Sequence, residues 1–165
     1  MEVVTLKIIE YEEKYLDDVK DLLVELEEYI LSIDKDNLDQ LHPEYRDKMA
    51  FVALDEVFKN NGKCYLALQN DKVVGLIMGI ISKYGKYDYL DYKCPKRAEI
   101  TEFIVSENSR SNGVGKLLID KIEDYFKINN CEYVLVDVFA YNTSAINFYL
   151  AHDYHSRMIV NIKKL

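Results

Sequence analysis

Apolar and polar positions follow helical spacing in four stretches of the chain. Over residues 15–33, apolar residues recur every three or four positions between acidic residues and lysines, a pattern typical of a long amphipathic helix. A second helix is predicted from about Pro43, a favourable first-turn residue, to Asn60. Two further helices are predicted at 113–129 and 142–151.

Short apolar runs rich in β-branched residues predict the strands. Two of them, at 64–68 and 73–82, flank the polar segment Gln69-Asn70-Asp71-Lys72 and predict a β-hairpin. The other predicted strands are Val3–Ile9, Ala98–Val105, Tyr133–Phe139 and Tyr154–Lys163. The tyrosine-rich segment 84–97 is expected to be a loop or a ragged extension of a strand.

The predicted order of elements is β-α-α-β-β-β-α-β-α-β, within one domain that spans residues 1–165. The hairpin requires antiparallel pairing, whereas the later strand–helix–strand units require parallel pairing through a crossover. We therefore expect an α/β (α+β) domain with a mixed, mostly antiparallel sheet and helices on both faces.

Charge is unevenly distributed along the chain and narrows the range of partners. The formal net charge is −8, with 17 acidic and 7 basic residues in positions 1–60 against 12 acidic and 14 basic residues in the remainder. An acidic surface disfavours general binding to nucleic acid and docking on anionic membranes. We expect neither partner.

The sequence carries no pattern of a membrane span, a signal peptide or a metal site. The longest nearly pure apolar run, 73–81, is too short to cross a bilayer, and MEVVTLKIIE lacks the basic and apolar regions of a signal peptide. The scattered Cys64, Cys94 and Cys131 form no CxxC pair, and the three histidines lack zinc-ligand spacing. A reducing, cytoplasmic location is expected.

A turn between a predicted strand and a predicted helix carries the clearest chemical signal. It contains the segment Arg110–Gly115, RSNGVG, followed by Lys116. Glycines let a ligand approach the backbone closely, and the unpaired N–H groups of a first helical turn favour a phosphate or pyrophosphate. A plain glycine-containing β–α turn is the alternative, since the chain has neither a P-loop nor a GxGxxG motif.

Two motifs resemble those of the GNAT superfamily of N-acetyltransferases. RSNGVG at 110–115 is similar to the family's R/Q-x-x-G-x-G/A signature, and NTSAINFY at 142–149 is similar to the N-x-x-A-x-x-F-Y helix after its fifth strand. The resemblance implies a GNAT-like fold and transfer of the acetyl group of acetyl-CoA to a primary amine by direct attack in a ternary complex. The sequence departs from the family at Asn112, often basic there, and at Asp153, usually glycine.

The resemblance also implies how acetyl-CoA would bind. Its pyrophosphate would lie on the N–H groups of the glycine turn, and its pantetheine arm would pair with a bulged, splayed strand as an added strand. The expected cofactor-binding residues are Phe103, Ile104, Val105, Arg110, Ser111, Asn112, Gly113, Val114, Gly115, Lys116, Asn142 and Phe148. The Phe103 N–H would polarise the thioester carbonyl, and Asn142 fits a plain helix cap equally well.

Four residues are candidates for proton transfer. Tyr149 matches the family's general acid toward the thiolate, although core packing is the simpler reading of a lone tyrosine. Glu99 is the first choice of base, and Asp137 matches a base position of some subfamilies. Alternation places Glu99 on the face that carries Phe103, and Glu102 on the other face unless a bulge changes the phase. Each carboxylate could instead be solvated or ion-paired.

The acceptor is not named by the sequence. In this family the first two helices wall the acceptor side, so the acidic first third of the chain would attract a cationic amine such as a polyamine, an aminosugar or a peptide. The same charges could simply solvate helix faces. Tyr84, Tyr87, Tyr89 and Tyr92 could line the acceptor entrance, a contact of a homodimer, or an exposed hairpin edge. Non-catalytic acyl-CoA binding or a regulatory role on the same fold is the alternative function.

Overall fold

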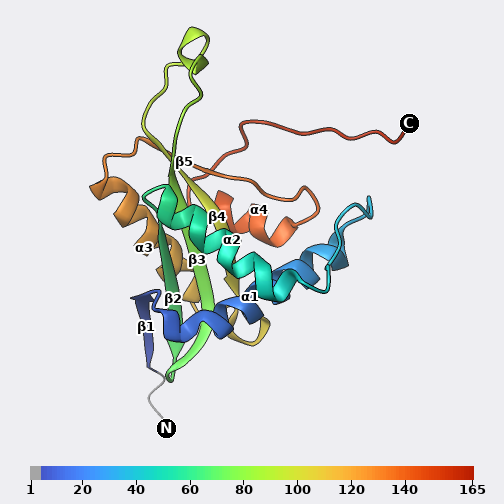
Figure 1. Cartoon of the computed structure of the whole chain (residues 1–165), viewed down its shortest axis with the longest axis vertical. Helices are drawn as coiled ribbons and strands as arrows, with labels where there is room; N and C mark the ends of the chain where they lie inside the picture. Colours follow the sequence, from blue (N-terminus) through green and yellow to red (C-terminus); the bar gives the residue numbers. More distant parts are fainter. Residues whose placement is uncertain (1–4) are drawn as a thin grey trace.

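A five-stranded sheet forms the centre of the computed structural model, which describes residues 5–165 (Figure 1). The strands are β1 (Leu6–Glu10), β2 (Lys63–Gln69), β3 (Lys72–Ser82), β4 (Arg97–Val105) and β5 (Tyr133–Val136). They lie in the order β1-β2-β3-β4-β5. The first three pairings are antiparallel and the β4–β5 pairing is parallel. The expected mixed, mostly antiparallel sheet is therefore confirmed.

Helices cover both faces of this sheet, as predicted. They are α1 (Leu16–Ile33), α2 (Tyr45–Lys59), α3 (Val114–Ile128) and α4 (Thr143–Leu150), with short 3-10 helices at Glu13–Tyr15, Asp88–Leu90 and Glu107–Ser109. Helices α1 and α2 share one apolar core with Leu66, Met78 and Ile104. Helices α3 and α4 share a second core with Ala67 and Ile77 on the opposite face.

The helices form where the apolar spacing predicted them because each buries one stripe. In α1 the buried residues Val19, Leu22 and Leu23 are three and four positions apart. In α3 the same spacing buries Leu118 and Ile122. No helix among residues 5–165 is long and apolar enough to cross a membrane.

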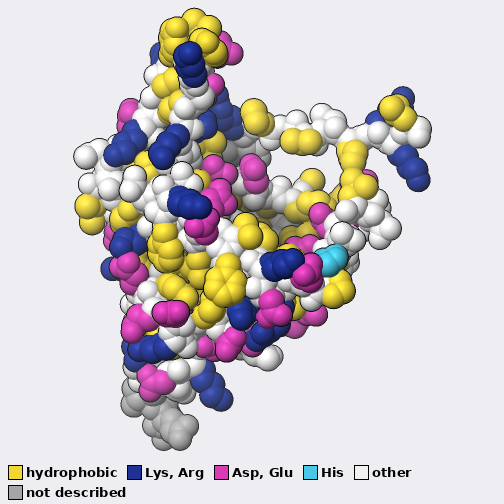
Figure 2. Space-filling model, in the orientation of Figure 1, with side chains coloured by type: hydrophobic (Ala, Val, Ile, Leu, Met, Phe, Trp, Pro, Cys, Tyr) yellow, Lys and Arg dark blue, Asp and Glu magenta, His cyan; other side chains and the backbone are white. Residues whose placement is uncertain are grey.

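The β2–β3 hairpin turns at Asn70 and Asp71, both with positive φ (49° and 62°), as the polar segment predicted. The tyrosine-rich connection between β3 and β4 is a loop that projects from the end of the sheet (Figure 1). Tyr87, Tyr89 and Leu90 of this loop are exposed, and hydrophobic side chains gather at the tip of the projection (Figure 2).

One predicted strand does not form. Residues 154–165 carry no regular secondary structure, and the chain leaves the body of the domain there (Figure 1). Strand β5 is also shorter than the predicted 133–139. A β-branched run becomes a strand only where a partner strand completes its hydrogen bonds. Strand β5 is the last strand in the sheet order, and none of the described residues pairs with its outer edge. Val3 and Val4 of the first predicted strand lie outside the described residues.

Candidate active site

A cleft of about 410 Å³ lies where β4, the following loop, α3, α4 and α1 meet. Its lining includes most of the residues expected to bind acetyl-CoA, together with Tyr149. These are Phe103, Ile104, Val105, Arg110, Ser111, Gly113, Gly115, Lys116, Asn142 and Phe148. Segments that are separated in the sequence thus meet at one concave surface, the usual geometry of a small-molecule site.

The cleft opens because β4 loses its neighbour on one side. Strand β5 pairs only with Arg97–Ile100, so the second half of β4 has a free edge. The Ser106 N–H donates to the Val74 carbonyl (2.9 Å), which marks residue 106 as hydrogen-bonded to β3. Hydrogen bonds alternate along an antiparallel pair. The backbone groups of Phe103 and Val105 therefore point to the free edge.

The glycine turn presents free N–H groups to the same cleft. Ser111 (φ 63°) and Gly113 (φ 78°) both adopt left-handed backbone conformations, and Gly113 is the N-cap of α3. The first intrahelical bond runs from Leu117 N to Gly113 O (3.2 Å). The N–H groups of the preceding helical residues have no intrahelical partner, which favours an anion.

Gly115 is needed for a different reason, close packing between α3 and α4. A Cβ atom there would lie 3.2 Å from the Phe148 ring and 3.5 Å from the Phe103 ring. The centres of the Phe103 and Phe148 rings are 5.3 Å apart. Gly115 thus lets the two aromatic residues close the floor of the cleft directly beneath the turn.

Two polar residues fix the outer wall of the cleft. Asn142 accepts hydrogen bonds from the Ala145 N–H (3.0 Å) and, at 3.3 Å, from the Tyr29 hydroxyl, so it caps α4 and also contacts α1. The Arg110 Nε donates to the Val105 carbonyl (2.9 Å), and its guanidinium lies 5.4 Å from the centre of the Tyr29 ring. Both expected residues are held by tertiary contacts.

Tyr149 lies at the inner end of the cleft and is buried. Its ring packs against Phe148 and Tyr154 at 5.5 and 5.3 Å. Burial raises the pKa of Tyr149 above its usual value, so its hydroxyl remains protonated at neutral pH. The residue is both part of the core and accessible from the cleft, so the two readings of the sequence do not exclude one another.

Some expected residues lie away from the cleft lining, and some lining residues were not expected. Asn112 is exposed, and the Val114 side chain is buried in the core beneath α3. Leu26 and Tyr29 of α1 join the lining, as do Ser144 and Ala145. Ala145 belongs to the NTSAINFY motif, whereas nothing in the helical pattern of α1 distinguished Leu26 and Tyr29.

Because of a bulge in β4, the acidic candidates do not lie on the sheet faces that simple alternation along the strand predicts. Ile100 is opposite Gly79 and Glu102 is opposite Met78, so Thr101 is the extra residue. Glu99 accepts a hydrogen bond from the Ser82 hydroxyl (3.2 Å), and Glu102 faces α1 and α2. The expectation that Glu99 shares a face with Phe103 and Val105 is wrong. Glu99 and Glu102 share the α1–α2 face instead.

Glu102 lies in a group of carboxylates that we call the inner cluster: Glu27, Glu56 and Glu102. Burial, together with the charges of Glu27 and Glu56, raises the pKa of Glu102 to about 7. Burial and the charge of Asp39 also raise the pKa of Glu27. Within residues 5–165, no lysine or arginine forms an ion pair with this cluster. Asp137, by contrast, follows β5 and is exposed.

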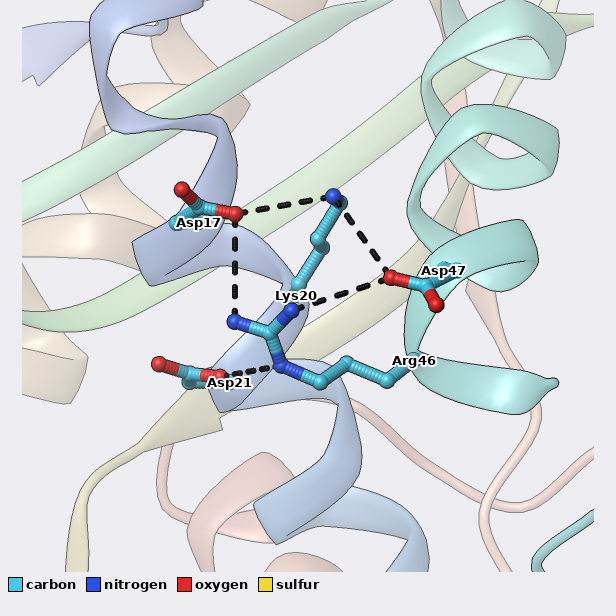
Figure 3. Close-up of polar contacts among 5 residues, drawn as sticks. All are labelled: Asp17, Lys20, Asp21, Arg46 and Asp47. Atoms are coloured by element: carbon cyan, nitrogen blue, oxygen red, sulfur yellow. Dashed lines mark hydrogen bonds and ion pairs between the residues drawn. The ribbon is translucent and has the colours of Figure 1, made fainter. Parts of the chain in front are cut away.

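A second acidic group lies on the exposed surfaces of α1 and α2 and is paired with cations (Figure 3). Arg46 Nε donates to Asp21 Oδ1 (2.8 Å), and its terminal nitrogens lie 3.8 Å from Asp17 and Asp47. Lys20 bridges the same two aspartates at 3.5 and 3.8 Å. We call these five residues the helix-surface cluster. It accounts for part of the acidic charge in the first third of the chain.

Comparison with known proteins decides the family. The model of the acetyltransferase (GNAT) family matches residues 26–154. The chain belongs to the GNAT family. A curated relative, an uncharacterised N-acetyltransferase of Methanocaldococcus jannaschii, is 29% identical over 97 residues. That match covers 58% of this chain and 54% of the relative, so it spans about half of that protein's length.

Solved structures share the GNAT fold over nearly the whole chain. A Pyrococcus furiosus protein provisionally named an acetyltransferase superposes with a TM-score of 0.72 at 18% identity, covering 98% of this chain and all of that one. AAC(6')-Iy, solved with the bisubstrate analogue CoA-S-monomethyl-acetylneamine, has a TM-score of 0.68 at 16% identity, with 98% and 99% coverage. The GNAT fold expected from the two motifs is confirmed.

Proposed function

We propose that this GNAT protein transfers the acetyl group of acetyl-CoA to a primary amine, by direct attack while both substrates are bound. The observation that carries the proposal is the cleft, where a free strand edge, a glycine turn and Tyr149 meet. Acetyl-CoA would supply the activated acetyl group and a thiolate leaving group. The remaining steps are carried by residues of this chain.

The cleft fits the two chemically distinct parts of CoA. The N–H groups at the start of α3, together with Arg110 and Lys116, suit its phosphates. The free edge of β4 suits the amide-containing pantetheine arm, which can add to it as a strand does. The Phe103 N–H on that edge would donate to the thioester oxygen as negative charge develops there.

Tyr149 is proposed as the general acid. Its raised pKa keeps the proton on the hydroxyl, and its position in the cleft lets it donate that proton to the departing sulfur. An ordinary thiol has a pKa of roughly 8.5, below that of this tyrosine, so a hydrogen bond from the Tyr149 hydroxyl would stabilise the sulfur as it gains negative charge.

Glu102 is proposed as the general base, in preference to Glu99 and Asp137. An alkylammonium has a pKa of about 10.4 and must lose a proton before its nitrogen can attack. A carboxylate with a pKa of about 7 accepts that proton better than an ordinary carboxylate, directly or through a water molecule. Glu102 also directly precedes Phe103, the proposed donor to the thioester oxygen.

The inner cluster also favours a cationic acceptor. Its carboxylates come from α1, α2 and β4, and none of them forms an ion pair with a lysine or arginine among residues 5–165. An amine that carries a second positive charge would be attracted to this side of the molecule. Polyamines, aminosugars and peptide amines are therefore the acceptor classes to test first.

The decisive experiment measures thiol release from acetyl-CoA with a panel of these amines, alongside thermal stabilisation by acetyl-CoA alone. We expect release with at least one class of amine. Tyr149→Phe should lower kcat by roughly 100-fold while thermal stabilisation by acetyl-CoA is retained.

Three other outcomes would count against parts of the proposal. Stabilisation by acetyl-CoA without release for any class of amine would favour a binding or regulatory module on this fold. Absence of stabilisation would remove the cleft as the CoA site. An unchanged kcat in Tyr149→Phe would remove the acid role and leave Tyr149 as a core residue.

A further inference from the structure

A carboxylate of α1 holds the loop that leads from β4 into the glycine turn. Glu25 accepts hydrogen bonds from the Ser106 hydroxyl (3.0 Å) and, through its other oxygen, from the Glu107 N–H (2.9 Å). These two donors are 81 and 82 residues away from it in the sequence. One carboxylate thus fastens the loop to a distant helix with both of its oxygens, and hydrogen bonds to an ionised acceptor are the stronger kind.

The contact supplies a partner that the loop itself does not provide. Residues Glu107–Ser109 form a short 3-10 helix, and the side chain of its N-cap, Ser106, makes no capping hydrogen bond. The first N–H groups of a helix need partners from outside the helix. Glu25 is that partner for the Glu107 N–H, while the Ser109 hydroxyl donates to Gln69 of β2 (3.3 Å). The loop is therefore fixed both from α1 and from the sheet.

The fixed loop continues directly into residues that line the cleft. Arg110 follows the 3-10 helix, and Ser111, with a positive φ of 63°, follows Arg110. Both residues line the cleft, whereas Glu25 is not part of its lining within the described part of the chain. A shift of the 3-10 helix would move the Arg110 guanidinium and the N–H groups of the glycine turn together. These groups can bind one phosphate only while they converge on it.

Glu25 is also close enough to Arg110 to affect its charge. One carboxylate oxygen lies 4.0 Å from a terminal nitrogen of Arg110, and the two side chains are 36% and 40% exposed. An ion pair of this length at an exposed site contributes little. The two shorter hydrogen bonds to the loop are the stronger interaction. The effect of Glu25 on the position of the turn should therefore exceed its electrostatic effect on a bound phosphate.

We propose that Glu25 is a positioning residue that holds the glycine turn in the conformation that accepts the pyrophosphate of acetyl-CoA. This inference rests on the proposed function, because it takes the cleft to be the CoA site. Apparent affinity falls in proportion to the fraction of molecules that have the binding conformation. Without Glu25 that fraction decreases, so binding through the phosphates weakens, while binding of the pantetheine arm along β4 is unaffected.

The first test measures the Kd for CoA by isothermal titration calorimetry. Glu25→Ala removes both hydrogen bonds and should raise the Kd roughly 10-fold, as expected if the turn keeps its binding conformation about one-tenth of the time. Glu25→Gln should restore most of the affinity, because a side-chain amide can accept from the Glu107 N–H and donate to the Ser106 hydroxyl oxygen. Glu28→Ala changes an exposed glutamate of the same helix and should bind CoA as the parent does.

The second test compares acetyl-CoA with S-acetylpantetheine as substrates in the thiol-release assay. S-acetylpantetheine has the same thioester and pantetheine arm but no phosphate and no nucleotide. Glu25→Ala should lower kcat/KM for acetyl-CoA roughly 10-fold, through KM, and should leave kcat/KM for S-acetylpantetheine within about two-fold of the parent. A variant that is simply less well folded would lose activity toward both substrates alike.

Three results would overturn the inference while the parent still binds CoA. An unchanged Kd in Glu25→Ala would show that the loop keeps its position without Glu25. Tighter binding by both Glu25 variants would show that the carboxylate competes with phosphate for Arg110. Equal losses for the two thioesters would show that Glu25 supports the whole site rather than the turn. If the parent itself does not bind CoA, the assignment of the cleft fails first and this inference fails with it.

Discussion

The helix-surface cluster and the inner cluster both contain carboxylates of α1 and α2, joined in the inner cluster by Glu102 of β4, yet their surroundings differ. Asp17, Asp21 and Asp47 are exposed and lie within 4 Å of Arg46 or Lys20 (Figure 3). In the inner cluster, burial and the charges of Glu27 and Glu56 raise the pKa of Glu102 to about 7. Burial opposes ionisation of Glu102 and Glu27, whereas the aspartates of the first cluster lie in solvent beside cations.

The comparison shows that total acidic charge is a poor guide to function here. Ion pairs on a helix surface contribute little to stability, because water screens the charges and fixing the two side chains in one geometry costs conformational entropy. Carboxylates that lie together without a cation, one of them buried, have an unfavourable electrostatic energy, which a proton or a cationic ligand can relieve. Perturbed titration of this kind is more frequent at functional sites than elsewhere.

The largest expected effect is on catalysis and comes from Glu102→Gln. If Glu102 is the base, kcat/KM should fall at least about 100-fold, in the range usual for loss of a general base. The rate of the unsubstituted enzyme should rise with pH through about 7, as Glu102 loses its proton. The variant should lose that rise, which a pH profile of kcat/KM measures.

Glu99→Gln is the matched control, because it makes the same change on the same sheet face on the other side of the bulge. We expect its kcat/KM to change only a few-fold. A larger loss in Glu99→Gln than in Glu102→Gln would return the base role to the residue that the sequence favoured.

A smaller effect is expected on stability, again from Glu102→Gln. The pKa of Glu102 is raised in the folded state, so the unfolded chain loses this proton first as pH rises. Folding is therefore opposed increasingly between the ordinary carboxyl range and about pH 7. The variant should be more stable than the parent by roughly 1–3 kcal/mol at pH 8, with a smaller gap at pH 5.5.

Urea unfolding at the two pH values measures this gap. Asp47→Asn of the helix-surface cluster serves as the control, and its stability difference from the parent should not widen in the same way. If the gap for Glu102→Gln is the same at both pH values, burial is not perturbing this carboxyl group and the contrast between the clusters fails.

The smallest effect is expected from Arg46→Ala in the helix-surface cluster. Exposed ion pairs contribute little to stability, so the free energy of unfolding should fall only slightly. The loss should shrink in 1 M salt, which screens exposed charges. Thiol release should be unchanged. A loss of activity in Arg46→Ala would show that the paired carboxylates also serve the site.

The parts of the fold governed by local chemistry were predictable from the sequence. Apolar spacing located α1 and α3 because each helix buries one stripe, and Asn142 starts α4 by capping it. The glycine turn was recognisable because its chemistry is also local. The backbone at Gly113 has a positive φ, a conformation that favours glycine. Family motifs at the turn and at α4 pointed to the same cleft.

The positions of the carboxylates were less predictable, because they depend on the register between strands. The bulge at Thr101 reverses the faces that follow it, and only the pairing with β3 reveals that extra residue. Glu27, Glu56 and Glu102 belong to three separate elements, so their mutual repulsion exists only in the folded chain. Leu26 and Tyr29 likewise line the cleft only because the folded chain brings α1 next to β4 and α4.

By itself, the sequence determined the helices, five of the strands and their order, the glycine turn before α3 and the family, since these depend on spacing and on residue chemistry within short segments. The tertiary structure decided which carboxylate is buried, which strand edge is open and where the last apolar run goes. These features depend on contacts between segments that are distant in the sequence. Neither segment alone can form the hydrogen bonds or bury the side chains that such a contact involves. A run such as Met158–Ile162 has the composition of a strand, but only an available partner edge makes it one.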